Sequence, residues 1–246
     1  MEGKGAEPTM TEDRSGDAVR HFSEEVGAEQ FHAYYDDRPE FRERLDIWYD
    51  LLDKHSVGGG LSIDMGCGTG VFSFYLSQKG ARVVGIDGSP EMVRFCDAQR
   101  VEQHLENIRF IEGRLPDVDV TGLTNADLVI SSSVVEYVED LDATLGLFAR
   151  VLKPRGTLIL SMPSLFCLNR VYERLMYRLT GEPQIYRFIR HFTSPSLLQR
   201  RMRRHNLWLE EVRYYAHYTP LARFTRTIRL PLPVTEDLFV AVFRKA

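Results

Sequence analysis

IDMGCGTG, residues 63–70, joins a short apolar run to an amphipathic segment at residues 71–78. The run has the composition of a strand, and the segment that follows has the periodicity of a helix. Glycine lets the backbone turn sharply and approach a ligand closely, where a Cβ atom would obstruct it. The three glycines therefore predict a ligand-binding loop between a strand and a helix.

Beyond this loop, short β-rich runs alternate with helix-length segments. We expect strands at 61–65, 82–86, 108–111, 127–131 and 157–162, and helices at 71–78, 89–103 and 141–152. Such alternation produces right-handed βαβ units and a parallel sheet, which predicts an α/β doubly wound domain. After Pro163 the pattern changes. There we expect helices at 165–179 and 194–205, and strands at 207–215 and 238–243 that form an antiparallel edge pair.

The chain is expected to divide into three parts. Residues 1–20, rich in small and polar side chains, should be a disordered tail. Residues 21–60 should form a helical segment that contains a helix at about 38–54. Residues 61–246 should form the ligand-binding domain, with a helical substrate cap inserted at 164–193.

Two carboxylates narrow the choice of ligand. The G-x-G-x-G spacing differs from the G-x-G-x-x-G of dinucleotide sites, where the loop meets a pyrophosphate. Asp64 is unfavourable beside a phosphate but favourable beside a cationic sulfonium that carries an amino-acid group. Asp87, at the end of the second strand, can accept hydrogen bonds from both ribose hydroxyls of an adenosine. A nicotinamide dinucleotide contains the same adenosine and is therefore an alternative ligand. A second alternative is that the loop is a tight turn that binds no ligand.

Three stretches resemble one protein family. IDMGCGTG resembles motif I of class I S-adenosyl-L-methionine (SAM)-dependent methyltransferases, especially the small-molecule branch that includes ubiquinone-biosynthesis enzymes. VVGIDGSPEM at 83–92 resembles the second motif, and VLKPRGTL at 151–158 is similar to the lead into the fifth strand. The resemblance covers about residues 61–163. It implies a Rossmann-like fold with a seven-stranded, mostly parallel sheet and an antiparallel last strand, and SAM as the cofactor.

The expected cofactor site departs from the family pattern after the third strand. The family commonly has Gly-Asp there, whereas this chain has EGRLP at 112–116. We therefore expect backbone groups of Arg114 and Leu115 to hold the adenine. Ser131 and Ser132 could contact the methionine group or cap the next helix. The residues expected at the cofactor are Asp64, Gly66, Cys67, Gly68, Gly70, Asp87, Gly88, Met92, Arg114, Leu115, Ser131 and Ser132.

Methyl transfer depends on alignment of the acceptor, and it needs a base if the nucleophile arrives protonated. Similar enzymes often carry Glu-His after the fourth strand, where this chain has Glu136-Tyr137. His191 is the first candidate for the base, with Glu136 and Tyr137 as alternatives. A lone histidine is more often a structural hydrogen-bonding group.

Acceptor binding is expected outside the shared sheet. In similar enzymes an aromatic stretch like that at 31–37 folds over the cofactor, which implies a helical lid at 21–60. Tyr34 or Tyr35 of this stretch could then face the methionine portion of the cofactor, or these rings could simply pack the helix onto the sheet. Arg170 and Arg174 begin a stripe of arginines at a spacing of four, and Arg190 follows among aromatic residues. These guanidinium groups suit an acceptor with a carboxylate or phosphate beside an apolar body, although a solvated helix face would have the same pattern.

Charge is unevenly distributed along the chain. The net charge is −4, but residues 1–163 carry −13 and residues 164–246 carry +9. The basic cluster RRMRR at 200–204 could contact an anionic membrane surface or an acidic carrier protein. A nucleic-acid partner ranks below both, because the cluster is short and the chain as a whole is acidic.

Other features of composition point to a cytoplasmic protein. No apolar stretch is long enough for a membrane span, and no signal peptide is recognisable at the N-terminus. The 3 cysteines are widely spaced and odd in number, which fits a reducing compartment. No Cys or His pairs have metal-ligand spacing, so we expect no metal.

These features predict a cytoplasmic SAM-dependent methyltransferase that acts at oxygen or carbon on a small or lipophilic acceptor, with or without an anionic group. One alternative is an NAD(P)-binding Rossmann oxidoreductase. Another is a SAM-binding scaffold without catalysis, which the missing Glu-His pair suggests.

Overall fold

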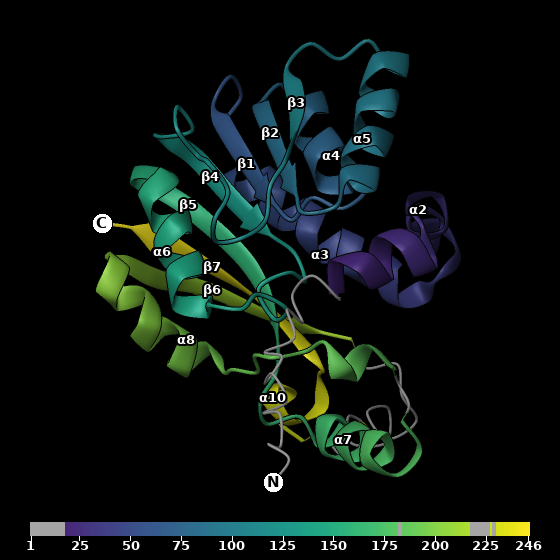
Figure 1. Ribbon diagram of the computed structural model, residues 1–246. Coiled ribbons are helices and arrows are strands. Elements are labelled where there is room, and N and C mark those ends of the chain that lie inside the picture. Colours follow the sequence, from purple (N-terminus) through teal and green to yellow (C-terminus); the bar gives the residue numbers. More distant parts are fainter. Residues whose placement is uncertain (1–17, 182–183, 217–226, 228–229) are drawn as a thin grey trace, which may run out of the picture.

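The computed structural model describes residues 18–181, 184–216, 227 and 230–246. Within these residues, the centre of the molecule is a seven-stranded sheet in the order β3-β2-β1-β4-β5-β7-β6, with helices on both faces (Figure 1). Strands β1 to β5 are parallel, and β7 is antiparallel to both of its neighbours. The predicted α/β Rossmann-like fold with an antiparallel last strand is confirmed. The strands are β1 (Leu61–Met65), β2 (Arg82–Asp87), β3 (Ile108–Glu112), β4 (Ala126–Ser131), β5 (Leu152–Pro163), β6 (Leu207–Tyr215) and β7 (Leu238–Lys245).

The last two strands pair antiparallel, as predicted, but only one of them lies at the edge. β7 lies between β5 and β6, with Phe243 opposite Leu158 on one side and Ala241 opposite Val212 on the other. Strand β5 is also longer than predicted. It begins at Leu152, directly after the preceding helix, where that residue pairs with Ala126 of β4.

The helices follow the predicted alternation. Ser89 caps α5, because its hydroxyl accepts a hydrogen bond from the Met92 amide at 3.2 Å, and Pro90 occupies the first turn. Ser194 and Pro195 begin α8 in the same way. The helices and helical turns are η1 (His21–Val26), α2 (Ala28–Asp37), α3 (Pro39–His55), α4 (Val71–Gln78), α5 (Pro90–Glu102), α6 (Leu141–Val151), α7 (Leu168–Thr180), η2 (Gln184–Arg187), α8 (Pro195–Met202), η3 (Arg203–His205) and α10 (Leu232–Thr235).

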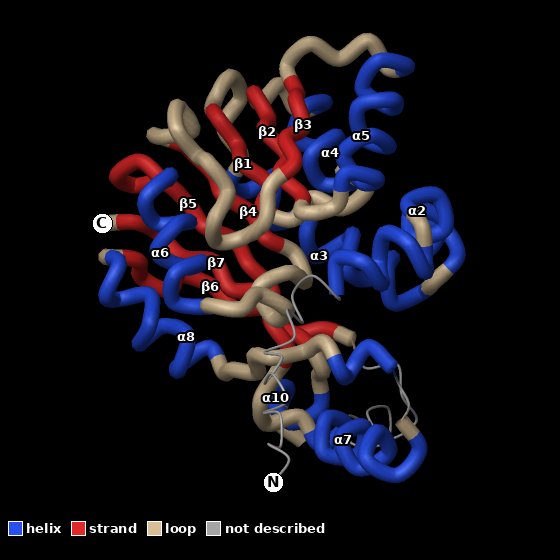
Figure 2. The backbone as a smooth tube through the Cα atoms, in the orientation of Figure 1, coloured by secondary structure: helices blue, strands red, loops and turns tan. Residues whose placement is uncertain are grey.

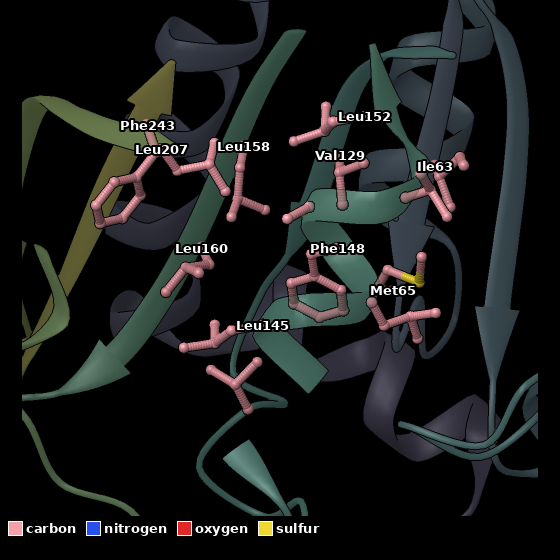
Figure 3. Packing of buried hydrophobic residues seen from close by; sticks show 14 of the residues in the cluster. Ile63, Met65, Val129, Leu145, Phe148, Leu152, Leu158, Leu160, Leu207 and Phe243 are labelled. Carbon is pink, nitrogen blue, oxygen red and sulfur yellow. The ribbon is translucent and has the colours of Figure 1, made fainter. Parts of the chain in front are cut away.

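A hydrophobic layer lies on each face of the sheet. On one face, Phe148 of α6 packs with Met65 of β1 and Leu160 of β5 (Figure 3). On the other, Trp48 of α3 joins the cluster that contains Leu128 of β4. Neighbouring strand residues alternate between the two clusters because side chains of a strand point to opposite faces. Figure 2 shows α7 beyond the carboxyl ends of the parallel strands, away from the helices that cover the sheet.

The N-terminal segment differs in part from its expected boundaries. Residues 18–20 are already helical and Ala18 is buried, so order begins before residue 21. The rest of the expected tail, residues 1–17, lies outside the described residues. Within the expected lid, α3 belongs to the core of the sheet, because Trp48 and Leu51 are fully buried against it. Residues of η1, α2 and the start of α3 instead line a cavity, among them Phe22, Phe31 and Phe41.

Candidate active site

A cavity of about 370 Å³ lies at the carboxyl ends of the central parallel strands. Its lining residues follow the strand order from β3 through β2 and β1 to β4, and β5 adds Pro163. The strand order reverses between β1 and β4, which is where open α/β sheets bind ligands. Of the residues predicted for the cofactor, acceptor and base, the following line the cavity: Asp64, Gly66, Cys67, Gly68, Asp87, Gly88, Met92, Arg114, Leu115, Ser132, Glu136, Tyr137, Tyr35 and Arg170.

The glycine loop forms one wall of this cavity. Gly66 has φ +80°, and a Cβ atom built on it would lie 2.3 Å from Val134 Cγ2. Gly68 has φ +53° and faces the ring of Phe31. The amides of Gly66 and Cys67 both donate to the Ile86 carbonyl of β2, at 2.7 and 3.0 Å. Glycine is thus needed both for the backbone conformation and for the space that it leaves.

Asp87 links this loop to the next strand. Its carboxylate accepts hydrogen bonds from the Gly68 amide at 2.8 Å and from the Ser89 amide at 2.9 Å. Burial raises the pKa of Asp87, while these two amides oppose the shift. Each carboxylate oxygen can accept a second hydrogen bond, so the group can still receive ligand hydroxyls.

Asp64, at the end of β1, is a buried carboxyl beneath the loop. It is 2% exposed and accepts a hydrogen bond from the Ser73 hydroxyl at 2.7 Å. Burial raises the pKa of Asp64 to about 7. At neutral pH the group is therefore poised between its two forms, and a nearby cation would favour the charged one.

Arg44 of α3 is a site residue that the sequence analysis missed. Its guanidinium donates to the Ser132 hydroxyl at 2.7 and 3.1 Å, and to the Ser132 carbonyl at 3.0 Å. Burial disfavours its charge, but the facing groups, Tyr35 first, outweigh burial and raise the pKa of Arg44. One signal was present: Arg44 lies four residues before Trp48, a charged residue on the apolar stripe of its helix.

Glu136 and Tyr137 lie where the loop after β4 meets the cavity. Glu136 is 3% exposed, and its Oε2 atom has no hydrogen-bond partner among the described residues. Burial raises the pKa of Glu136 to about 7, against the opposing effect of Arg44. Burial also raises the pKa of Tyr137. The ring of Tyr137 lies edge-on to Phe22, 5.8 Å between centroids, so it belongs to the aromatic wall.

The N-terminal helices close this side of the cavity with aromatic rings. Phe22, Phe31 and Tyr35 line it, and Phe31 contacts both of the others at about 6 Å between centroids. His32 Nδ1 lies 3.3 Å from the Thr69 hydroxyl, which ties α2 to the glycine loop. Of the two candidate tyrosines, only Tyr35 lines the cavity. Tyr34 instead packs its ring against the Arg38 guanidinium, 3.6 Å from the centroid.

Two predicted cofactor residues lie outside the cavity lining and have structural contacts. Gly70 precedes α4 with φ +76°, and a Cβ atom there would lie 2.9 Å from the Phe74 ring. Ser131 is fully buried, and its hydroxyl donates to the Met65 carbonyl of β1 at 2.9 Å. Neither Ser131 nor Ser132 caps the next helix, because Asp140 caps α6 through the Ala143 amide.

His191, the first candidate for the base, also lies outside the cavity lining. Its Nε2 atom is 2.9 Å from the Val138 carbonyl, and burial lowers its pKa. The backbone amides of Arg190 and His191 both donate to the Glu136 carbonyl, at 2.8 and 3.2 Å. This segment therefore supports the loop that carries Glu136.

The arginine stripe of α7 does not converge on the cavity. Arg170 lines it, but its guanidinium already bonds Glu173 at 2.7 Å and the Asp237 carbonyl at 3.3 Å. Arg174 is exposed and lies against the Phe192 ring, 5.6 Å from the centroid. The buried Nε atoms of Arg170 and Arg190 have no partner among the described residues, and Arg190 lies outside the cavity lining.

The family described as "Methyltransferase domain" matches residues 59–214, more than half of the chain. The chain belongs to this methyltransferase family. It is a class I SAM-dependent methyltransferase, which decides against the oxidoreductase alternative. Its cofactor is SAM.

Several known proteins are similar to this methyltransferase. The ubiquinone biosynthesis O-methyltransferase of Xanthomonas oryzae pv. oryzae is 30% identical over 173 residues, which cover 69% of this chain and 70% of the relative. Methyltransferase cfoB of Aspergillus candidus is 28% identical over 167 residues, covering 62% and 50%. Among solved structures, magnesium protoporphyrin IX methyltransferase of Synechocystis PCC 6803 has a TM-score of 0.70 at 17% identity, covering 95% of this chain and all of that one.

Two further observations concern partners. In the described part of the methyltransferase, no helix is both long and apolar enough to cross a membrane. Across those same residues, no three His, Cys, Asp or Glu side chains are grouped so that they could hold a metal ion.

Proposed function

We propose that this methyltransferase O-methylates a small lipophilic acceptor, with Glu136 as the base that takes the hydroxyl proton. One observation carries the proposal: the Glu136 carboxyl is buried in the cavity wall, and its Oε2 atom has no partner among the described residues. A buried polar atom without a partner costs about 1–3 kcal/mol. A ligand hydroxyl would recover that cost. The name of the Xanthomonas relative, an O-methyltransferase, supports methylation at oxygen.

The cavity fits SAM by the chemistry of its lining. The glycines leave a cradle that a Cβ atom would fill, and Asp87 has lone pairs available for ribose hydroxyls. At the β1 and β4 side, the Arg44 guanidinium suits the carboxylate of an amino-acid group, and Asp64 suits the positive charge. SAM supplies a methyl group activated by a sulfonium.

Glu136 has the properties of a general base at neutral pH. Because burial raises the pKa of Glu136 to about 7, its ionised form can accept a proton from a phenol or enol more readily than an ordinary carboxylate would. Oε2 would take the proton of the acceptor O–H, and the electron pair of that bond would stay on the acceptor oxygen. This oxygen would then displace the sulfur at the methyl carbon, and the sulfur would keep the electrons of the broken C–S bond in neutral S-adenosylhomocysteine. Arg44 beside it favours the ionised carboxylate.

The acceptor itself should be largely apolar. Phe22, Phe31, Phe41 and Leu238 line the cavity together with Ile189. We propose that η1 and α2 act as the lid and that residues 164–193 act as the acceptor cap, since His21 of the lid lies 5.1 Å from Phe188 of the cap between ring centroids. The Arg170 Nε atom could hold one acceptor oxygen, so an anionic group on the acceptor is compatible with the site but not required by it.

We place this activity in the cytoplasm. Cys67, Cys96 and Cys167 are all free thiols, and free thiols persist in a reducing compartment. A nucleic-acid acceptor is disfavoured, because the cavity wall is largely apolar and aromatic.

The test compares Glu136→Gln with His191→Gln, using labelled SAM and a panel of lipophilic phenols and enols. We expect Glu136→Gln to lower kcat by about 10²–10⁴-fold and to leave the Kd for S-adenosylhomocysteine unchanged by calorimetry. His191→Gln should retain most of the rate, because His191 lies outside the cavity lining. If the Glu136→Gln rate stays within about threefold of the wild type, or if His191→Gln loses the rate instead, Glu136 is not the base.

A further inference from the structure

Helix α7 presents an apolar face to solvent. Its residues 168, 171, 172, 175 and 179 recur at spacings of three and four, and they therefore form one stripe. In a soluble protein such a stripe normally packs inward. Here the side chains are 41–71% exposed, and the stripe continues into the loop before the helix. The exposed apolar residues are Leu165, Phe166, Leu168, Val171, Tyr172, Leu175 and Leu179.

The inward face of α7 is polar, and its contacts fix this orientation. Asn169 is 1% exposed and donates to both carboxylate oxygens of Asp237, at 3.0 and 3.1 Å. The Cys167 thiol donates to the same carboxylate at 3.1 Å. Arg170 bonds the Asp237 carbonyl and Glu173. Turning the apolar stripe inward would expose or break this network, so the outward stripe is a stable feature of the fold.

The charge around the stripe is positive. Arg174 and Arg178 are exposed and lie along one border of the stripe, at i+3 from Val171 and Leu175 respectively. The acidic residue of α7, Glu173, is turned inward and paired with Arg170. The exposed surface of α7 is therefore an apolar stripe with a basic border.

We propose that the exposed face of α7 binds an anionic lipid surface. A helix with a wide apolar face and Arg residues beside it lies in the membrane interface, with the apolar residues among the acyl chains and the cations at the headgroups. A second copy of the chain fits less well, because a two-fold contact would bring the same basic border against itself. The proposal is independent of which residue is the base.

The position of α7 also relates this surface to the cavity. Arg170 of α7 lines the cavity, as does Pro163 at the end of β5, a few residues before the stripe begins. The helix that carries the stripe thus also contributes to the cavity wall, through its opposite face. The lipid-binding role of this surface does not depend on which acceptor the enzyme methylates.

The basic cluster at 200–204 is a weaker candidate for the same contact. α8 packs Leu198 and Met202 against the sheet and shows no comparable apolar stripe. Arg201 forms a salt bridge with Asp142, and Arg203 lies over the Trp208 ring. Figure 1 places α8 beside α6, away from α7. Within the basic residues 164–246, we therefore propose α7 and not the cluster at 200–204 as the membrane contact.

The experiment is co-sedimentation of the full chain with phosphatidylcholine vesicles, with and without phosphatidylglycerol. The test variant is Leu175→Glu with Leu179→Glu. The matched control is Val101→Glu, which adds a charge at a 60% exposed apolar residue on α5. We expect the wild type and the control to bind the anionic vesicles, and the test variant to lose at least about tenfold in partitioning. Added salt should weaken wild-type binding, because the arginine contribution is screened.

Three results would overturn the proposal. The first is that the wild type does not sediment with anionic vesicles. The second is that the test variant binds these vesicles as well as the control does. The third is that the wild type forms a dimer, which the test variant does not form, and that neither protein binds vesicles. The Kd for S-adenosylhomocysteine should be the same in the test variant and the wild type. That measurement separates loss of the lipid contact from loss of the fold or of the cofactor site.

Discussion

Replacing Glu136 with glutamine should make the protein more stable at alkaline pH while it removes the proposed base. Glutamine has nearly the shape of a protonated glutamic acid, but it cannot ionise. Below pH 4.5, where the carboxyl is protonated in both the folded and the unfolded chain, the two proteins should therefore have similar free energies of unfolding.

The magnitude follows from the pKa of Glu136. Burial raises it from 4.5 to about 7 in the folded protein. The folded state then holds the proton more tightly than the unfolded state, so stability is highest below pH 4.5 and falls as pH rises towards and through 7. One pKa unit corresponds to about 1.4 kcal/mol, so the ionised carboxyl costs roughly 3 kcal/mol once pH exceeds 7. Glu136→Gln removes this cost.

Urea unfolding at several pH values measures the difference directly. The free energy of unfolding of Glu136→Gln minus that of the wild type should rise from near zero at pH 4.5 to about 3 kcal/mol at pH 8.5. Asp64 also has a raised pKa, but it is present in both proteins and its effect cancels in the difference. Glu139→Gln, three residues away and exposed, is the control and should change stability by less than about 0.5 kcal/mol. A difference that does not vary with pH would refute the idea that Glu136 is held in a site that disfavours its charge.

Three other predictions concern the cofactor site. Gly66→Ala should destabilise the protein by about 2 kcal/mol or more in urea unfolding, because of its positive φ and the contact with Val134. Gly59→Ala, with φ +73° but open space around it, should cost only about 1 kcal/mol, and equal effects would mean that the Val134 contact is unimportant. Asp87→Asn should raise the Kd for S-adenosylhomocysteine by about tenfold or more in calorimetry, because charged acceptors bond more strongly than amides, and an unchanged Kd would contradict the ribose assignment. Binding of SAM near pH 7 should release roughly one more proton than binding of S-adenosylhomocysteine. Calorimetry in buffers of different ionisation enthalpy measures this proton release. Equal release for the two ligands would mean that the sulfonium does not act on the buried carboxyls.

Much of the fold could be predicted because its signals are local. The glycine loop, the serine caps of α5 and α8 and the bounds of β6 all depend on neighbouring residues. The position of β7 could not be predicted in the same way. The pattern of two final strands indicates that they pair, but whether the second inserts beside β5 depends on contacts such as Phe243 with Leu158, more than 80 residues apart.

In the candidate site, too, some features depend on local sequence signals and others on long-range contacts. Its cofactor half comes from strand ends and the turns that follow them, so most of the predicted residues do line the cavity. Its other half depends on long-range contacts. Arg44 becomes a site residue through Ser132, 88 residues away, and His191 is turned to the Val138 carbonyl. Periodicity predicted helix α7, but which of its faces turns inward depends on Asp237, 68 residues from Asn169.

Burial of the site carboxyls lowers the stability of the fold, and it also makes their protonation depend on the charge of the bound cofactor. Asp64 and Glu136 both have pKa values raised to about 7 by burial. The charge of Arg44 opposes the shift in both, and that of Arg170 also opposes it in Glu136. With these protein cations alone, a large share of each carboxyl is protonated at neutral pH, and a protonated Glu136 cannot act as a base. A sulfonium bound in this cavity adds the missing positive charge and favours the ionised forms. The base would therefore become competent when SAM is bound, and less so with the uncharged product, S-adenosylhomocysteine.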